Sequence, residues 1–174
     1  MAWGFPVVGG DASQREASPS DSRKEASPQD LRARALRLLA RREHSRAELR
    51  RKLSPHVQEG IDLEALLDDF TKRGWLSEQR FVEQAVRAKA RKYGPLKIAH
   101  HLREKGIDEA GIETGLAQAR AEEGEALASA WRARFGRPPA DESERAKQVR
   151  FLQQRGFPLE SVLRFLKAES QAAR

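Results

Sequence analysis

Apolar residues recur at helical spacing through most of the chain. Leu31, Ala35, Leu38 and Leu39 lie at positions i, i+4, i+7 and i+8, which places them on one stripe of a helix. Similar spacing recurs further along the chain, while β-branched residues are few and no segment alternates apolar and polar residues over a useful length. The pattern therefore predicts an all-α fold.

Capping and helix-stopping residues set the expected bounds of the first four helices. Each helix is preceded by a Ser or Asp that can cap it: Ser27, Ser45, Asp62 and Ser77. Ser45-Arg46-Ala47-Glu48 has the spacing of a capping box, and Asp30 lies three residues after Ser27. Pro55 is expected to help end the second helix and Gly74 to end the third.

A repeat of about 50 residues organises these helices. Shifting the chain by 50 superimposes two sets of residues: Lys97, Leu102, Gly106, Ile107, Ile112 and Leu116 on Lys147, Leu152, Gly156, Phe157, Val162 and Leu166. The first segment fits the same frame with a longer loop, so that Leu49 and Leu53 match Ile98 and Leu102. We expect three units of three helices, over residues 30–74, 75–121 and 122–174.

Three short helices bury little surface alone, so apolar residues of neighbouring units are expected to pack against one another. The predicted architecture is an elongated, curved stack of tandem units. Such a stack exposes an extended surface and seldom encloses a deep pocket, which favours a binding protein over an enzyme.

Residues 1–29 differ from the rest of the chain. They are rich in Gly, Ser, Ala and Pro, with too little apolar side chain to offset the chain entropy of folding. We expect a flexible N-terminal tail, in which Trp3, Phe5, Val7 and Val8 are either free or dock on a partner or on the body.

Composition excludes several classes of protein. The 174 residues include no Cys, which removes disulfides, thiolate metal sites and a cysteine nucleophile. No apolar run reaches the roughly 20 residues that cross a bilayer, and the first residues lack the pattern of a signal peptide. We therefore expect a cytoplasmic protein without a membrane partner.

Basic residues exceed acidic ones by 33 to 26, a net charge of +7. Between Leu31 and Leu53 there are nine basic residues and two acids, whereas residues 59–69 hold five acids and no base. Basic rows at helical spacing suit phosphates or an acidic protein groove; the alternative is a solvated helix face. The candidate contacts are Arg34, Arg37, Arg41, Arg46, Arg50, Arg87, Arg91, Lys97, Lys147 and Arg150.

Motifs of enzymes and metal sites are missing from the sequence. There is no Gly-rich phosphate loop and no His-Glu-x-x-His. His100 and His101 are adjacent and point apart on a helix, and His44 has no obvious carboxylate neighbour. We expect no catalytic residue, metal or cofactor. Trp75 and Trp131 are expected to pack in the core or between units, as is Tyr93, for which stacking on a base is the alternative.

Three segments carry a resemblance to a known family: Arg73-Gly-Trp-Leu-Ser-Glu-Gln-Arg-Phe81, Arg91-Lys-Tyr-Gly-Pro-Leu-Lys-Ile98 and Leu102-Arg-Glu-Lys-Gly-Ile107. Over about residues 31–168 the chain resembles the bacterial RecX family, which regulates the RecA recombinase. One departure is Ser77-Glu78, where family members usually carry two acidic or Asp/Asn residues; Ser can still cap the helix.

The resemblance implies three tandem three-helix units and a non-enzymatic role in DNA recombination, DNA repair and the SOS response. RecX proteins bind RecA–DNA filaments, limit their extension or promote their disassembly, and so inhibit ATPase, strand exchange and co-protease activity; some bind DNA directly. The implied partners are the RecA filament and single- or double-stranded DNA, with no small-molecule substrate. Two alternatives stay open: a DNA-binding protein that acts independently of RecA, and a peptide-binding helical scaffold.

Overall fold

The computed structural model describes residues 27–173, and over this range the chain is helical without a strand. Its elements are α1 (Pro28–Leu39), α2 (Arg46–Leu53), a short 3-10 helix η1 (Ser54–His56), α3 (Leu63–Lys72), α4 (Glu78–Lys89), α5 (Pro95–Glu104), α6 (Glu109–Ala121), α7 (Glu123–Arg134), α8 (Glu142–Gln154) and α9 (Leu159–Ala172). The predicted all-α fold is confirmed. Of the predicted tail 1–29, residues 1–26 lie outside the described range, and α1 already begins at Pro28.

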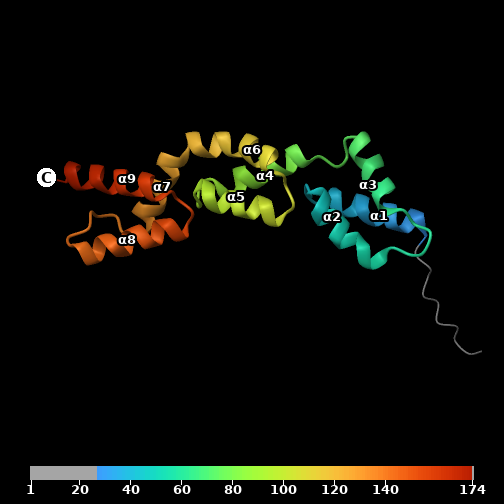
Figure 1. Ribbon diagram of the computed structural model, residues 1–174, viewed down its shortest axis with the longest axis horizontal. Helices are drawn as coiled ribbons and strands as arrows, with labels where there is room; N and C mark the ends of the chain where they lie inside the picture. Colours follow the sequence, from blue (N-terminus) through green and yellow to red (C-terminus); the bar gives the residue numbers. More distant parts are fainter. Residues whose placement is uncertain (1–26, 174) are drawn as a thin grey trace, which may run out of the picture.

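The helices form three groups of three that follow one another along an elongated molecule (Figure 1). The groups are α1–α3, α4–α6 and α7–α9, and each has its own hydrophobic core. Leu31 and Phe70 lie in the first core, Ile98 and Leu116 in the second, and Trp131 in the third. Each unit therefore has its own small core, and the three cores follow one another along the molecule.

Positions that the repeat aligned are buried alike in all three units. Leu53, Leu102 and Leu152, on the second helix of each unit, are all 0% exposed. Phe70, Leu116 and Leu166, on the third helix, are buried as well. Because equivalent residues fill equivalent cores, the apolar repeat reports a structural repeat of about 50 residues.

The predicted helix starts are largely confirmed. Ser27 and Asp30 form a reciprocal capping box, and the side chains of Asp62 and Ser77 accept backbone hydrogen bonds at the starts of α3 and α4. At α2 only half of the predicted capping box forms: Ser45 accepts from the Glu48 amide, but the Glu48 carboxylate turns away to bind other side chains. Gly74 follows the end of α3, as predicted, and has the left-handed conformation with φ of 70°.

The two tryptophans differ in burial. Trp131 is buried in the third core, as predicted, and its indole N–H donates to Gln148 at 2.7 Å. The prediction is wrong for Trp75, which is 40% exposed. It follows the Gly74 turn at the surface, where its ring packs edge-on against Phe70 and lies beside two guanidinium groups rather than within the core.

Candidate interaction surface

The second helices of the units, α8, α5 and α2, follow one another along the long axis of the molecule (Figure 1). The beginning of α2 contacts the turn after α5, and the beginning of α5 contacts the turn after α8. We call these contacts the first joint (Ser45–Glu48 against Lys105–Gly106) and the second joint (Gly94–Lys97 against Arg155–Gly156). Equivalent parts of the repeat thus meet at both joints.

The second joint is made by backbone groups. The Gly94 amide donates to the carbonyl of Arg155 at 2.9 Å, and the Leu96 amide donates to the carbonyl of Gly156 at 3.1 Å. A Cβ atom on Gly94 would overlap the carbonyl of Gly156. Because the two main chains approach so closely, glycine is required at this joint.

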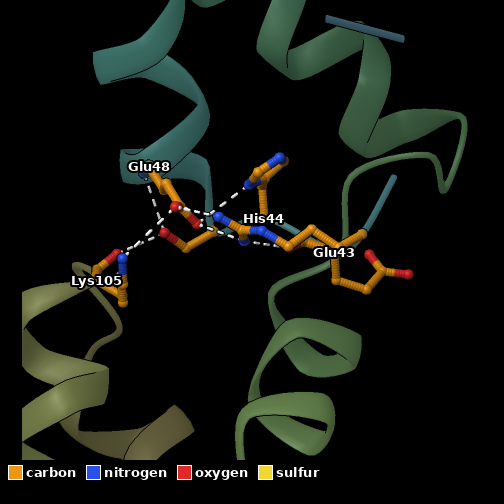
Figure 2. Close-up of polar contacts among 6 residues, drawn as sticks. Glu43, His44, Glu48 and Lys105 are labelled. Carbon is orange, nitrogen blue, oxygen red and sulfur yellow. Dashed lines mark hydrogen bonds and ion pairs between the residues drawn. The ribbon is translucent and has the colours of Figure 1, made fainter. Parts of the chain in front are cut away.

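The first joint is made by side chains around Glu48 (Figure 2). Glu48 is only 3% exposed. Its carboxylate accepts two hydrogen bonds from the Arg42 guanidinium, at 3.0 and 2.6 Å, and lies 3.5 Å from Nζ of Lys105 in the next unit. Ser45 Oγ donates to the backbone carbonyl of Lys105 at 2.6 Å. A buried carboxylate thus ties the first unit to the second.

His44 completes this cluster and contradicts the expectation that it lacks a carboxylate neighbour. Its Nδ1 lies 3.2 Å from Glu48 Oε2, and the imidazole is 2% exposed. His44 and Glu48 are four residues apart, which was a signal for this contact that sequence reasoning missed, and His44 lies just before the Ser45 cap of α2. Burial lowers the pKa of His44 despite the carboxylate, so the neutral ring donates its Nδ1–H to Glu48.

Hydrogen bonds from Arg42 are the main cause that lowers the pKa of Glu48 to about 2, against the opposing effect of burial. The carboxylate is therefore ionised at neutral pH and its acceptor sites are used by groups of the protein itself. This arrangement suits a structural tie between units. Within residues 27–173 there is no group of three or more His, Cys, Asp or Glu residues arranged to hold a metal ion.

Two of the predicted contact residues are neutralised by acids of the same unit. Arg46 lies 2.8 Å from Glu64 and 2.7 Å from Asp68, and Arg50 lies 2.5 Å from Glu64. Hydrogen bonds from Arg50, and then from Arg46, lower the pKa of Glu64 to about 2. The sequence suggested that bases and acids occupy separate helices, but packing of α2 beside α3 brings them together.

The other eight predicted residues form no ion pair with a carboxylate in the described part of the chain. They lie on or directly after α1, α4, α5 and α8 and are all exposed: Arg34, Arg37, Arg41, Arg87, Arg91, Lys97, Lys147 and Arg150. Arg37 donates to a carbonyl of its own helix, and Lys97 donates across the second joint to the carbonyl of Gln154 at 3.4 Å. Each unit therefore presents cations that are free to meet an anionic partner.

Other surface arginines are paired with carboxylates. Arg103 binds Glu109, Arg120 binds Glu113 and Arg132 binds Glu125, at 2.6 to 2.9 Å. Arg80, on α4, binds Glu43 at 2.7 Å. No helix within residues 27–173 is long and apolar enough to span a membrane.

Family models and curated proteins show what most of the helical body is similar to. The chain matches the models of the first, second and third three-helix domains of RecX over residues 32–56, 77–116 and 121–166. It is 46% identical over 134 residues to the regulatory protein RecX of Ralstonia nicotianae, covering 77% of this chain and 84% of that protein. The RecX protein of Herbaspirillum seropedicae is 48% identical over 130 residues, covering 75% and 84%.

Solved structures show the same fold. The crystal structure of RecX from Lactobacillus salivarius superimposes with a TM-score of 0.67 at 21% identity, covering 83% of this chain and 97% of that one. A second crystal structure of regulatory protein RecX gives a TM-score of 0.64 at 25% identity, covering 81% and 75%. The tandem three-helix architecture is thus shared with these structures.

Proposed function

The chain belongs to the RecX family of regulatory proteins, and we propose that it is a non-enzymatic negative regulator of the RecA recombinase. In this proposal it binds the RecA–DNA filament in the cytoplasm and limits its extension or promotes its disassembly. RecA's ATPase, strand-exchange and co-protease activities then fall because fewer RecA subunits remain in active filaments.

The shape of the molecule supports a partner with a repeating surface. Its three units are arranged in series, and the two joints tie the units to one another (Figure 1). Cations on different units are thereby held along one elongated body. A polymer of identical subunits offers repeated sites to such a body, and several weak contacts made together raise avidity without a deep pocket.

The observation that carries the proposal is the set of exposed, unpaired cations on all three units. Arg34, Arg37 and Arg41 come from the first unit, Arg87 and Arg91 from the second. Lys147 and Arg150 come from the third. Cations that are not neutralised within the protein are available to acidic protein surface or to phosphate, and electrostatic complementarity speeds encounter with a polyanionic filament. Arg46 and Arg50 carry less weight, because Glu64 and Asp68 together neutralise them.

The test is RecA's DNA-dependent ATPase on long single-stranded DNA, with this protein well below one copy per RecA subunit. We expect strong inhibition by the native chain. The variant Arg34→Gln/Arg37→Gln/Arg41→Gln should inhibit less. The matched control, Arg103→Gln/Arg120→Gln/Arg132→Gln, loses the same three charges from arginines that are already paired, and should inhibit like the native protein.

Two results would contradict the proposal. Full inhibition by the α1 variant and by a corresponding Lys147→Gln/Arg150→Gln variant would show that the unpaired cations do not bind the filament. Inhibition that appears only when the protein saturates the DNA would indicate a DNA-binding protein that acts independently of RecA.

A further inference from the structure

A groove lies between α4 and α6 on the surface of the second unit, away from the two joints. It has a volume of about 530 Å³. Apolar residues line it from both sides: Val82 and Val86 on α4, Ile107 just before α6, and Ala110 on α6. The two helices pack against each other over 12 and 13 residues. The groove therefore offers an apolar surface that follows a pair of helices.

Two glycines of α6 set the shape of this groove. A Cβ atom on Gly115 would overlap Cγ1 of Val82, so α6 packs this closely on α4 because residue 115 has no side chain. Gly111 lies four residues earlier on the same face of α6 and also lines the groove. The contact between the helices thus closes the floor of the groove, and the space above the floor is left open to a partner.

The charged residues that line the groove are all acidic. They are Glu78 and Glu83 on α4 and Asp108 just before α6. Glu83 accepts a hydrogen bond from Gln79 at 3.0 Å, and Asp108 accepts one from the Gly111 amide at 2.8 Å. These donors are neutral, and within residues 27–173 none of the three carboxylates forms an ion pair.

This charge distinguishes the groove from the rest of the surface. Four other grooves in the described part of the chain each include at least one arginine. The chain as a whole has a net charge of +7. An apolar groove bordered only by carboxylates is therefore a local anionic site on a basic protein.

We propose that this groove binds a basic amphipathic helix of another protein. An apolar stripe on that helix packs against Val82, Val86 and Ala110, as in other helix-in-groove complexes. Lysines or arginines beside the stripe then meet the three carboxylates. Charge complementarity selects a basic segment over an acidic one, and the same carboxylates repel the phosphates of nucleic acid.

This binding goes beyond the proposed regulation of RecA. The proposed filament contact depends on unpaired cations of the protein, whereas the groove acts through acids and apolar side chains on different residues. The two surfaces can therefore be altered separately.

The experiment uses the full chain and measures the anisotropy of a fluorescein-labelled helical peptide of about 14 residues, which spans about 21 Å. The peptide carries leucines at positions i, i+3, i+4 and i+7 and lysines elsewhere. Glu78→Gln/Glu83→Gln should weaken its binding about fivefold, as expected for the loss of two exposed ion pairs. The control, Glu59→Gln/Glu142→Gln, removes two exposed carboxylates outside the groove and should bind like the native chain.

A second variant tests the shape of the groove. Ala110 is exposed on α6, so Ala110→Phe leaves the core intact while its ring occupies the groove. Binding of the peptide should fall at least about tenfold because of the clash. Circular dichroism checks that each variant is folded.

Several outcomes would overturn the inference. They are equal weakening in the charge variant and its control, unchanged binding by Ala110→Phe, and equal binding of a peptide with the same composition in scrambled order or with glutamates in place of the lysines. A native chain that sediments as a dimer, and as a monomer with Ala110→Phe, would instead assign the groove to a second copy of this chain. RecA inhibition is measured separately on the same variants, so the proposed regulation can survive when the groove fails, and the reverse.

Discussion

Ser45 and Lys105 are 60 residues apart in the sequence, yet Ser45 Oγ donates a 2.6 Å hydrogen bond to the Lys105 carbonyl. The same hydroxyl accepts from the Glu48 amide and so caps α2. One side chain therefore begins a helix of the first unit and holds the last turn of a helix in the second. Local helix formation and the joining of units are coupled through it.

Replacing Ser45 by Ala should lower the free energy of unfolding by more than the loss of a helix cap alone. We expect a loss of about 2 kcal/mol, of which about 1 comes from the cap and about 1 from the hydrogen bond across the joint. Ser77→Ala is the control, because Ser77 also caps a helix; it should cost about 1 kcal/mol. Urea unfolding measures both. Equal costs would show that the bond to Lys105 contributes nothing.

Glu48→Gln should weaken the first joint. The neutral amide cannot hold Arg42 and Lys105 by charge, and hydrogen bonds to charged groups are worth about 1.5–3 kcal/mol each, so we expect a loss of about 2–3 kcal/mol in unfolding free energy. Glu64→Gln, which alters an exposed ion pair, should change stability little. A Glu48 variant as stable as the Glu64 control would contradict the structural role of this cluster.

Stability should fall as the pH drops below about 6.5 because of His44. Its pKa is lowered from an ordinary value of 6.5, so the unfolded chain takes up a proton before the folded chain does. Glu48 adds a loss of the same sign below about 4.5, since its folded pKa is about 2. Melting temperatures at pH 7 and pH 5 should differ more for the native chain than for His44→Gln. An identical pH dependence in the two proteins would show that His44 does not cause the loss of stability.

Gly94→Ala tests the second joint. Gly94 has φ of −76°, which Ala tolerates, so its effect must come from overlap with the Gly156 carbonyl. Overpacking of this kind costs about 1–3 kcal/mol. Gly124→Ala, in α7 with open space around it, should instead stabilise by up to about 1 kcal/mol. If thermal unfolding shows the same change for both, the close approach of the two main chains is not needed for stability.

Helix periodicity and the 50-residue repeat predicted most of the fold, because the apolar positions show which side of each helix packs in the core of its unit. Leu53 and Leu102 were matched by spacing alone and are both buried. The pairing of Arg50 with Glu64 was not predicted, since it depends on how the longer loop of the first unit returns α3 to α2. The exposure of Trp75 has the same kind of origin: the Gly74 turn, rather than residue type, decides where the ring lies.

The contacts at the two joints also could not be predicted from the sequence repeat. A helical repeat shows that Gly106 and Gly156 are equivalent, but not that the next unit lies against them. A Cβ on Gly106 would overlap the Cβ of Ala47, a close approach between units that only coordinates reveal. For the candidate surface, nine of the ten predicted cations are exposed and Arg46 is partly buried, but spacing could not separate Arg34, which is unpaired, from Arg46, which binds Glu64 and Asp68.

The most direct test of the central claim is the length of RecA filaments on long single-stranded DNA, measured by electron microscopy with this protein well below one copy per RecA subunit. We predict markedly shorter filaments with the native chain and with the control that lacks Arg103, Arg120 and Arg132, and near-normal lengths with the variant that lacks Arg34, Arg37 and Arg41. Filaments of unchanged length with the native protein would contradict it.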